Sequence, residues 1–279
     1  MAMVINTNVA SINSQRQLTS TNNALSTSME RLSSGLRVNS AKDDAAGLAI
    51  GDRMDSQIRG MTVATRNASD GISMAQTAEA AMGEITSTMQ RMRDLAVQSA
   101  NSGAVTSGDR DKLQSEFKQL DDELKRIVQN TEFNGKKIIN GSLSGGINIQ
   151  VGANTTADNQ IAVSVANMLD VLSEVQLADI GGTNSEPGAL SAIKQIDIAI
   201  ESIDTARAKL GAIQNRFTTT ISNLQSSIEN QSAARSRIMD TDFAAETAAL
   251  SRNQILQQAG TAMLSQANQA PNAVLGLLR

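Results

Sequence analysis

One stripe of apolar residues near the C-terminal end constrains the fold of this chain more than any other feature. Within residues 193–238, ten of the fourteen positions that alternate three and four residues apart are apolar. Such spacing over about six heptads is typical of a coiled-coil seam. At about 1.5 Å per residue, this helix would be about 69 Å long. The apolar seam positions are Ile193, Ile196, Ile200, Ile203, Leu210, Phe217, Ile221, Leu224, Ile228 and Ile238.

Two further segments also have helical periodicity. Apolar stripes occupy residues 58–96 and 113–127, and Ser40 with Asp43 and Thr106 with Asp109 have the spacing of capping boxes. Between residues 138 and 165 the apolar period changes to two, next to Asn-Gly pairs that favour turns. The sequence therefore predicts a rod domain over residues 43–237. It would contain three long helices and a β-hairpin region at about 134–180.

The two ends of the chain carry almost no charge. Arg16 is the only charged residue before Glu30, and residues 253–278 contain none. A solvated or disordered tail normally carries charge, so a flexible low-complexity tail is the less favoured interpretation. Neutral polar ends favour packing against copies of the same chain, because identical charges repel each other across a self-interface. We therefore expect the ends to assemble.

Both ends also have seven-residue spacing of apolar side chains. Stripes at the two extremes of a chain can pair only if the chain folds back on itself. We therefore expect a mainly α fold: an elongated antiparallel helical bundle or coiled-coil rod with paired N- and C-terminal helices. Residues 1–42 and 238–279 would form the terminal domain, with no separate outer domain. Residues expected to pack in the inner core of an assembly are Val4, Leu18, Leu25, Met29, Leu32, Leu256, Ala259, Met263, Ala267, Val274 and Leu277.

The composition excludes many classes of enzyme and binding protein. The chain has no His and no Cys, which excludes a Ser-His-Asp triad, a Cys nucleophile, a His or Cys zinc site and a disulfide. A net charge of -4 argues against binding to nucleic acid, and no apolar run approaches the roughly 18 residues of a membrane span. The acidic pairs lack a third ligand at EF-hand spacing. We expect no enzyme activity and no cofactor.

Several strings of the sequence resemble those of bacterial flagellins. Residues 30–50 are similar to the N-terminal signature of that family, and residues 90–101, 210–217 and 254–264 are similar to later family motifs. The resemblance covers about residues 1–140 and 190–279 in the same order. It implies a structural subunit of the flagellar filament, the propeller of a swimming bacterium. It also implies a secreted, extracellular protein exported through the flagellum's own type III channel, without a cleavable signal peptide.

The resemblance further implies several partners. The subunit would form a helical homopolymer of many copies and would meet an export chaperone, a filament cap and hook-junction proteins. Ser and Thr residues between 142 and 191 would be available for O-glycosylation, as in some flagellins. Two alternatives are a hook-filament junction protein of the same superfamily and a coiled-coil adaptor that binds a different protein.

Recognition by host innate immune receptors is also implied by the resemblance. Residues 30–51 resemble the epitope of the plant receptor, a site on residues 91–116 resembles that of the animal Toll-like receptor for flagellin, and the last three residues resemble the tail read by inflammasome sensors. Asp94 departs from the family pattern, which more usually has Glu there. The implied receptor contacts are Arg37, Asp43, Arg91, Leu95, Glu116, Leu278 and Arg279.

Overall fold

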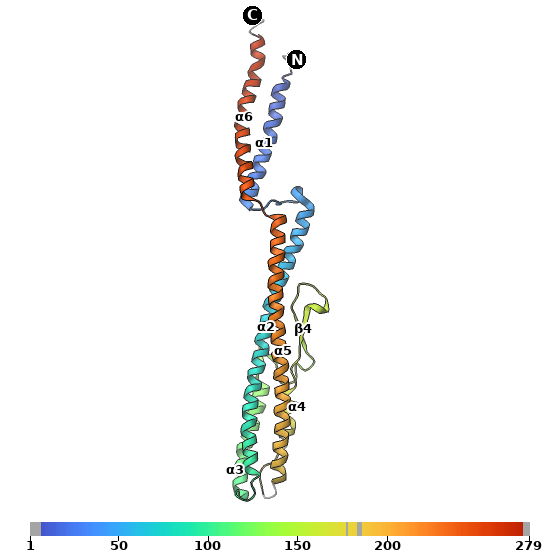
Figure 1. Cartoon of the computed structure of the whole chain (residues 1–279), viewed down its shortest axis with the longest axis vertical. Coiled ribbons are helices and arrows are strands. Elements are labelled where there is room, and N and C mark those ends of the chain that lie inside the picture. The colour runs from blue at the N-terminus through green and yellow to red at the C-terminus, as the bar shows by residue number, and fades with distance from the viewer. Residues whose placement is uncertain (1–6, 177, 183–185, 276–279) are drawn as a thin grey trace. The chain divides into compact units, whose positions relative to one another are not determined.

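The computed structural model describes residues 7–176, 178–182 and 186–275, and it confirms a mainly α-helical fold (Figure 1). The helices are α1 (Val9–Ser34), α2 (Ala41–Ser99), α3 (Ser107–Asn130), α4 (Met168–Gln176), α5 (Glu186–Met239) and α6 (Phe243–Leu275). The chain divides into a terminal unit, residues 1–56 with 230–279, and a central unit, residues 57–229. None of the described helices has the length and apolar content needed to cross a membrane.

Two antiparallel strand pairs lie in the central unit. Strand β1 (Glu132–Phe133) pairs with β2 (Lys136–Lys137), and β3 (Ile147–Gln150) pairs with β4 (Gln160–Val163) after the short 3-10 helix η1 (Ala157–Asn159). Ile161 and Val163 alternate with exposed residues and are buried in the core, as a period of two requires. The same region contains α4, whose nine residues the sequence analysis did not distinguish from the strands.

Helix α5 supplies one fully buried side of the central core. Its buried residues recur every seven positions, at Ile196, Ile203, Leu210, Phe217 and Leu224. The second predicted row, Ile193, Ile200, Ile221 and Ile228, is only half-buried, and the alanines at 192, 199 and 206 are buried instead. Residues of α2, α3, α4 and the β3–β4 pair share this core cluster, so α5 is covered on more than one side. Its buried stripe is therefore wider than the predicted coiled-coil seam.

A glycine on α2 makes room for the largest side chain of this core. The ring of Phe217 is fully buried, and a Cβ atom built on Gly71 would lie 2.8 Å from its Cζ and 2.8 Å from Cδ1 of Ile149. Both distances are shorter than a carbon–carbon contact of about 3.5–4.0 Å. Gly71 thus permits α5 and strand β3 to approach α2 at the same point.

Polar contacts hold α2 in register with its neighbours. Arg93 Nε donates to Asp197 Oδ1 on α5 at 2.7 Å, and the hydrogen bond from Arg93 to Asp197 raises the pKa of the guanidinium. Further along α2, Glu79 Oε2 accepts a hydrogen bond of 2.8 Å from Gln214 Nε2. Since residue 93 meets residue 197 while residue 79 meets residue 214, α2 and α5 are antiparallel.

The start of α2 uses two aspartates in different ways. Asp43 Oδ2 accepts from the backbone N–H of Ser40 at 2.9 Å and from its hydroxyl at 3.0 Å, and these bonds hold the pKa of Asp43 below its usual value. Asp44 has extended backbone angles, and its Oδ1 accepts from the N–H of Gly47 at 2.8 Å. The regular helix therefore begins after Asp44, four residues later than the predicted cap at Ser40.

Candidate functional site

The terminal unit is built around an antiparallel pair of helices, α1 and α6, which lie side by side (Figure 1). Their facing positions alternate three and four residues apart on both helices, so the pair has coiled-coil spacing. The α1 seam consists of Ser11, Ser14, Leu18, Thr21, Leu25, Ser28 and Leu32. The α6 seam consists of Glu246, Leu250, Asn253, Gln257, Gly260, Leu264 and Ala267.

Hydrogen bonds fix the alignment of this pair. Ser11 Oγ donates to Asn268 Oδ1 at 2.6 Å, and Asn8 Nδ2 donates to the carbonyl of Ala267 at 2.7 Å. Near the middle, Gln257 Nε2 donates to Asn22 Oδ1 at 2.9 Å. Partly buried polar groups need such partners, and a shift by one heptad would remove all of them. The seam is therefore specific in register although half of its residues are polar.

Close approach of the helices depends on one small residue. A Cβ atom built on Gly260 would lie 3.3 Å from Cδ1 of Leu18, so the leucine side chain packs directly over the α6 backbone. At the other end of the pair, Arg31 Nη1 and Glu246 Oε2 are 3.8 Å apart. Together these contacts explain how α1 and α6 pair along their length although their seam has few large apolar residues.

The segment that joins α1 to α2 is hydrogen-bonded to the segment that joins α5 to α6. The N–H of Arg37 donates to the carbonyl of Met239 at 2.7 Å, and its Nη2 donates to the carbonyl of Ile238 at 2.7 Å. The N–H of Thr241 donates to the carbonyl of Gly35 at 3.0 Å. Gly35 has a φ of 71°, a left-handed conformation that ends α1 and that a glycine adopts without strain.

An apolar face remains uncovered on the outside of the helix pair. Ile255 and Met263 are 66% and 60% exposed, and the segment of α6 from Asn253 onward has no charged residue. We give the name outer apolar face to six of the exposed apolar side chains of this pair: Val9, Ile12, Met29, Ile255, Leu256 and Met263. Neutral surfaces with several large apolar side chains are typical of protein interfaces.

The predicted inner-core residues fall into three groups. Leu18, Leu25, Leu32 and Ala267 lie half-buried in the α1–α6 seam, whereas Met29, Leu256, Ala259 and Met263 are exposed within a single chain. Val4, Leu277 and the side chain of Val274 lie outside the described residues. Within a single chain, Gln257, Gly260 and Leu264, each one position later than a predicted residue, are the ones that lie half-buried toward α1. The packing of the predicted residues in the inner core of an assembly stays a prediction. A polar or small residue in the seam adds nothing to a hydrophobic pattern. Only the spacing of Ser11, Thr21 and Ser28 could have indicated that they lie on the side of α1 that faces α6.

The residues implied as receptor contacts occupy very different environments. Arg91 is exposed on α2, and its Nη2 donates to Glu116 Oε1 on α3 at 2.7 Å. Leu95 is 1% exposed in the core, so it presents no surface in the folded central unit. Arg37 and Asp43 are exposed and hydrogen-bonded in the terminal unit. Leu278 and Arg279 lie outside the described residues.

The contacts described in the terminal unit are those of helix packing. Within residues 7–176, 178–182 and 186–275, no cluster of three or more acidic side chains is arranged to hold a metal ion. The main feature of the terminal unit is a pair of helices with few charged residues and with exposed apolar side chains. Such a surface is suited to association with further copies.

Comparisons with known proteins identify the family. The model of the bacterial flagellin N-terminal helical region matches residues 5–143, and that of the bacterial flagellin C-terminal helical region matches residues 193–278. A flagellin of Halalkalibacterium halodurans is 44% identical over 277 residues, and a flagellin of Bacillus subtilis is 42% identical over 306 residues; each alignment covers 99% of this chain and 100% of the relative.

A solved structure agrees with these matches. The crystal structure of Bacillus cereus flagellin aligns with a TM-score of 0.50 at 30% identity, over 61% of this chain and 94% of that one. The matched segments contain both helices of the terminal pair, all of α2 and α3, and most of α5. The chain belongs to the bacterial flagellins, and it is a structural subunit of the bacterial flagellar filament.

Proposed function

We propose that the outer apolar face is the surface through which copies of this chain contact one another in the inner layer of the filament. The terminal unit would supply that inner layer, and the central unit would supply a second layer around it. What supports this proposal is the combination of exposed Ile255, Leu256 and Met263 with the absence of charge over residues 253–278. In a helical polymer every surface group repeats at a fixed spacing, so charges there would face their own copies.

The proposal is tested by seeded elongation. Filament fragments are mixed with the wild-type chain or with a chain carrying Ile255→Glu and Met263→Glu, and growth is followed by light scattering and electron microscopy. Burying a carboxylate without a partner costs several kcal/mol. Since each 1.4 kcal/mol is a factor of ten, we expect the subunit concentration needed for elongation to rise more than 100-fold.

A matched variant separates charge from packing. Ile255→Leu with Met263→Leu keeps both positions apolar and is expected to elongate close to the wild-type rate. Circular dichroism of each variant at 222 nm, compared with the wild-type chain, checks that neither variant has lost its helices. Wild-type elongation by the glutamate variant would exclude the outer apolar face from the interface between copies.

The same surface would serve the other assembly partners. We propose that α6 is held by an export chaperone before assembly, because its neutral apolar face would otherwise pair prematurely with other copies. The filament cap and the hook-junction proteins would contact the same helix pair at the two ends of the polymer. On the extracellular side, exposed hydroxyls such as Ser142, Thr155 and Ser191 would be the O-glycosylation sites.

Receptor recognition is proposed for the paired α2–α3 surface around Arg91 and Glu116. These side chains are exposed and hydrogen-bonded to each other, and they form a fixed polar feature on two helices. Arg91→Ala is expected to weaken activation of a reporter for the animal flagellin receptor at least tenfold at equal protein concentration. Leu95→Ala is not a useful test, because it would open a cavity in the core.

The control for this prediction is Arg126→Ala. Arg126 is an exposed arginine on α3 that also pairs with a glutamate, Glu123, at 2.5 Å, so its removal deletes an exposed arginine–glutamate pair that lies within α3. Its dose–response curve is expected to match the wild type. An equal loss in the two variants, or no loss for Arg91→Ala, would refute a contact at Arg91.

A further inference from the structure

The methionines of this chain differ widely in their access to solvent. Met29 of α1 is 52% exposed and Met263 of α6 is 60% exposed, whereas Met54 is half-buried. Met1 and Met3 lie outside the described residues. The remaining methionines are buried, and they are Met61, Met74, Met82, Met89, Met92, Met168 and Met239. Two thioethers are thus open to reagents in the surrounding water while most of the others are not.

Both exposed methionines belong to the outer apolar face, and neither is part of the α1–α6 seam. Arg31 pairs with Glu246 at the start of α6, so the neighbouring Met29 lies at that end of the pair. Met263 lies in the second half of α6, toward the other end of the pair. A chemical change of these two side chains would therefore alter the outer apolar face at two separate places.

A thioether that is open to solvent reacts with a peroxide. A lone pair of the sulfur attacks one oxygen of hydrogen peroxide, a sulfur–oxygen bond forms, and the oxygen–oxygen bond breaks. The other oxygen leaves with both hydrogens as water, so the sulfur is oxidised and the peroxide is reduced. The product is a methionine sulfoxide, which is polar and which a methionine sulfoxide reductase converts back to the thioether. The reaction thus replaces an apolar side chain by a polar one reversibly.

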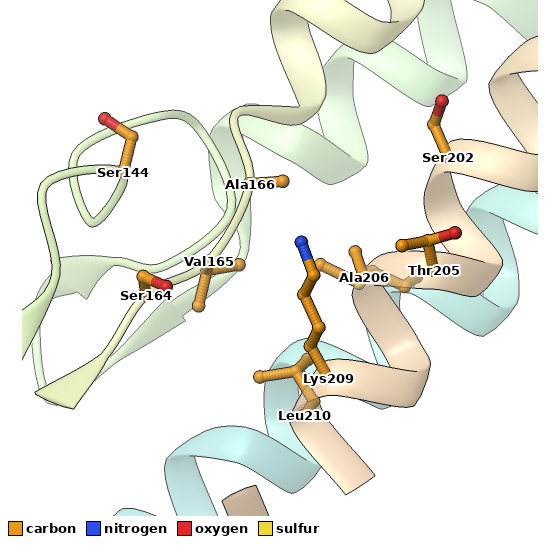
Figure 2. A pocket seen from close by; sticks show the side chains of 10 residues that line it. Ser144, Ser164, Val165, Ala166, Ser202, Thr205, Ala206, Lys209 and Leu210 are labelled. Carbon is orange, nitrogen blue, oxygen red and sulfur yellow. The ribbon is translucent and has the colours of Figure 1, made fainter. Parts of the chain in front are cut away.

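The central unit shields its methionines from this reaction. Met82 of α2 lines a cavity of about 170 Å³ together with Val165 and Ala206 (Figure 2). Even so, Met82 is 0% exposed, as are Met89 and Met92 further along α2. An oxidant must touch the sulfur to react, and close packing leaves no room for it there. These three methionines are therefore internal references for the two exposed ones.

We propose that Met29 and Met263 are sites of reversible oxidation by peroxides, and that their sulfoxides prevent the subunit from joining the filament. This proposal rests on the proposed role of the outer apolar face. A polar group that leaves water needs a hydrogen-bond partner. The residues one and two turns before Met263 on α6, Ala259 and Leu256, are exposed and apolar and offer none through their side chains. Burial of the sulfoxide between copies is therefore unfavourable.

The first experiment measures reactivity in the full-length monomer. The chain is treated with hydrogen peroxide, and peptide mass spectrometry follows the gain of one oxygen at each methionine over time. We expect Met29 and Met263 to be oxidised at least about tenfold faster than Met82, Met89 and Met92, because only the first two sulfurs are open to solvent. Equal rates at the exposed and the buried positions would overturn the proposal.

The second experiment measures seeded elongation before and after peroxide treatment. For the oxidised wild-type chain we expect the subunit concentration needed for elongation to rise at least about tenfold, and a methionine sulfoxide reductase is expected to reverse the rise. A chain with Met29→Leu and Met263→Leu has no thioether at either place, so its elongation is expected to be the same before and after peroxide. Met54→Leu removes a half-buried methionine of the same unit and is expected to leave the sensitivity to peroxide intact.

Three results would overturn this proposal. They are unchanged elongation of the oxidised wild-type chain, an equal loss in the double leucine variant, and a loss of helix on oxidation in circular dichroism at 222 nm. Failure of the proposed interface gives a different result, because the chain with Ile255→Glu and Met263→Glu would then elongate normally. If that chain does not elongate while oxidised wild-type chain does, the interface stands and only the oxidation proposal is wrong.

Discussion

Replacing Phe217 with alanine is expected to lower the free energy of unfolding of the central unit by about 3–5 kcal/mol. Its ring is fully buried between α5, α2 and strand β3, where it meets Ile149 and the backbone at Gly71. The substitution removes a large apolar group and leaves a cavity that the surrounding helices can close only in part. Urea unfolding followed by circular dichroism at 222 nm measures the change.

The control for this prediction is Phe243→Ala. Phe243 begins α6 in the terminal unit and is 55% exposed, so its removal deletes the same side chain from a largely solvated position. We expect a change below about 1 kcal/mol. If the two variants lost equal stability, the assignment of Phe217 to the centre of the core would be wrong.

Gly71→Ala is expected to destabilise the central unit by about 1–3 kcal/mol, the usual cost of overpacking a core. The added methyl group would lie 2.8 Å from the ring of Phe217 and 2.8 Å from Ile149, and both neighbours are packed on their other sides. Either α2 must move away from α5 or strand β3 must shift. Thermal unfolding of the purified variant should show a lower midpoint than the wild type.

The same substitution on the same helix is expected to have the opposite sign at Gly83. A Cβ atom there would meet nothing within 4 Å, and the position lies in the interior of α2. Alanine in a helix interior is favoured over glycine by about 0.5–1 kcal/mol, since glycine loses more backbone freedom on folding. If Gly83→Ala lowered stability as much as Gly71→Ala, the close contact at Gly71 would not explain the loss at that position.

The seven-residue period of large apolar side chains on α5 could be predicted from the sequence. The second buried row of α5, which consists of alanines, could not. The isoleucines, leucines and phenylalanine every seven residues from Ile196 to Leu224 are apolar and are buried. The alanines at 192, 199 and 206 are also buried, although an alanine contributes little to a hydrophobic pattern. Their burial follows from the neighbours that cover α5, and these come from sequence positions far from it.

For the terminal pair as well, the sequence did not indicate which row of α6 is covered. Spacing of seven was visible at both ends, yet the more apolar row of α6, with Leu256, Ala259 and Met263, is not the row that faces α1. Gln257 and Gly260 face α1 because their partners, Asn22 and Leu18, offer a hydrogen bond and a protruding side chain. Complementarity between the two helices decided which row of α6 is covered, and a shift of one residue turns that row by about 100° around the helix.

By itself the sequence determined the helical character of the chain, the small β region, the neutrality of the two ends and membership in the flagellins, because each of these depends on local periodicity, composition or contiguous motifs. Only the tertiary structure decided which row of each helix is covered, that Leu95 is a core residue, and that Gly71 accommodates Phe217. The physical reason is that a helix repeats its side chains every few residues whatever surrounds it, whereas burial depends on partners that folding brings from distant parts of the chain.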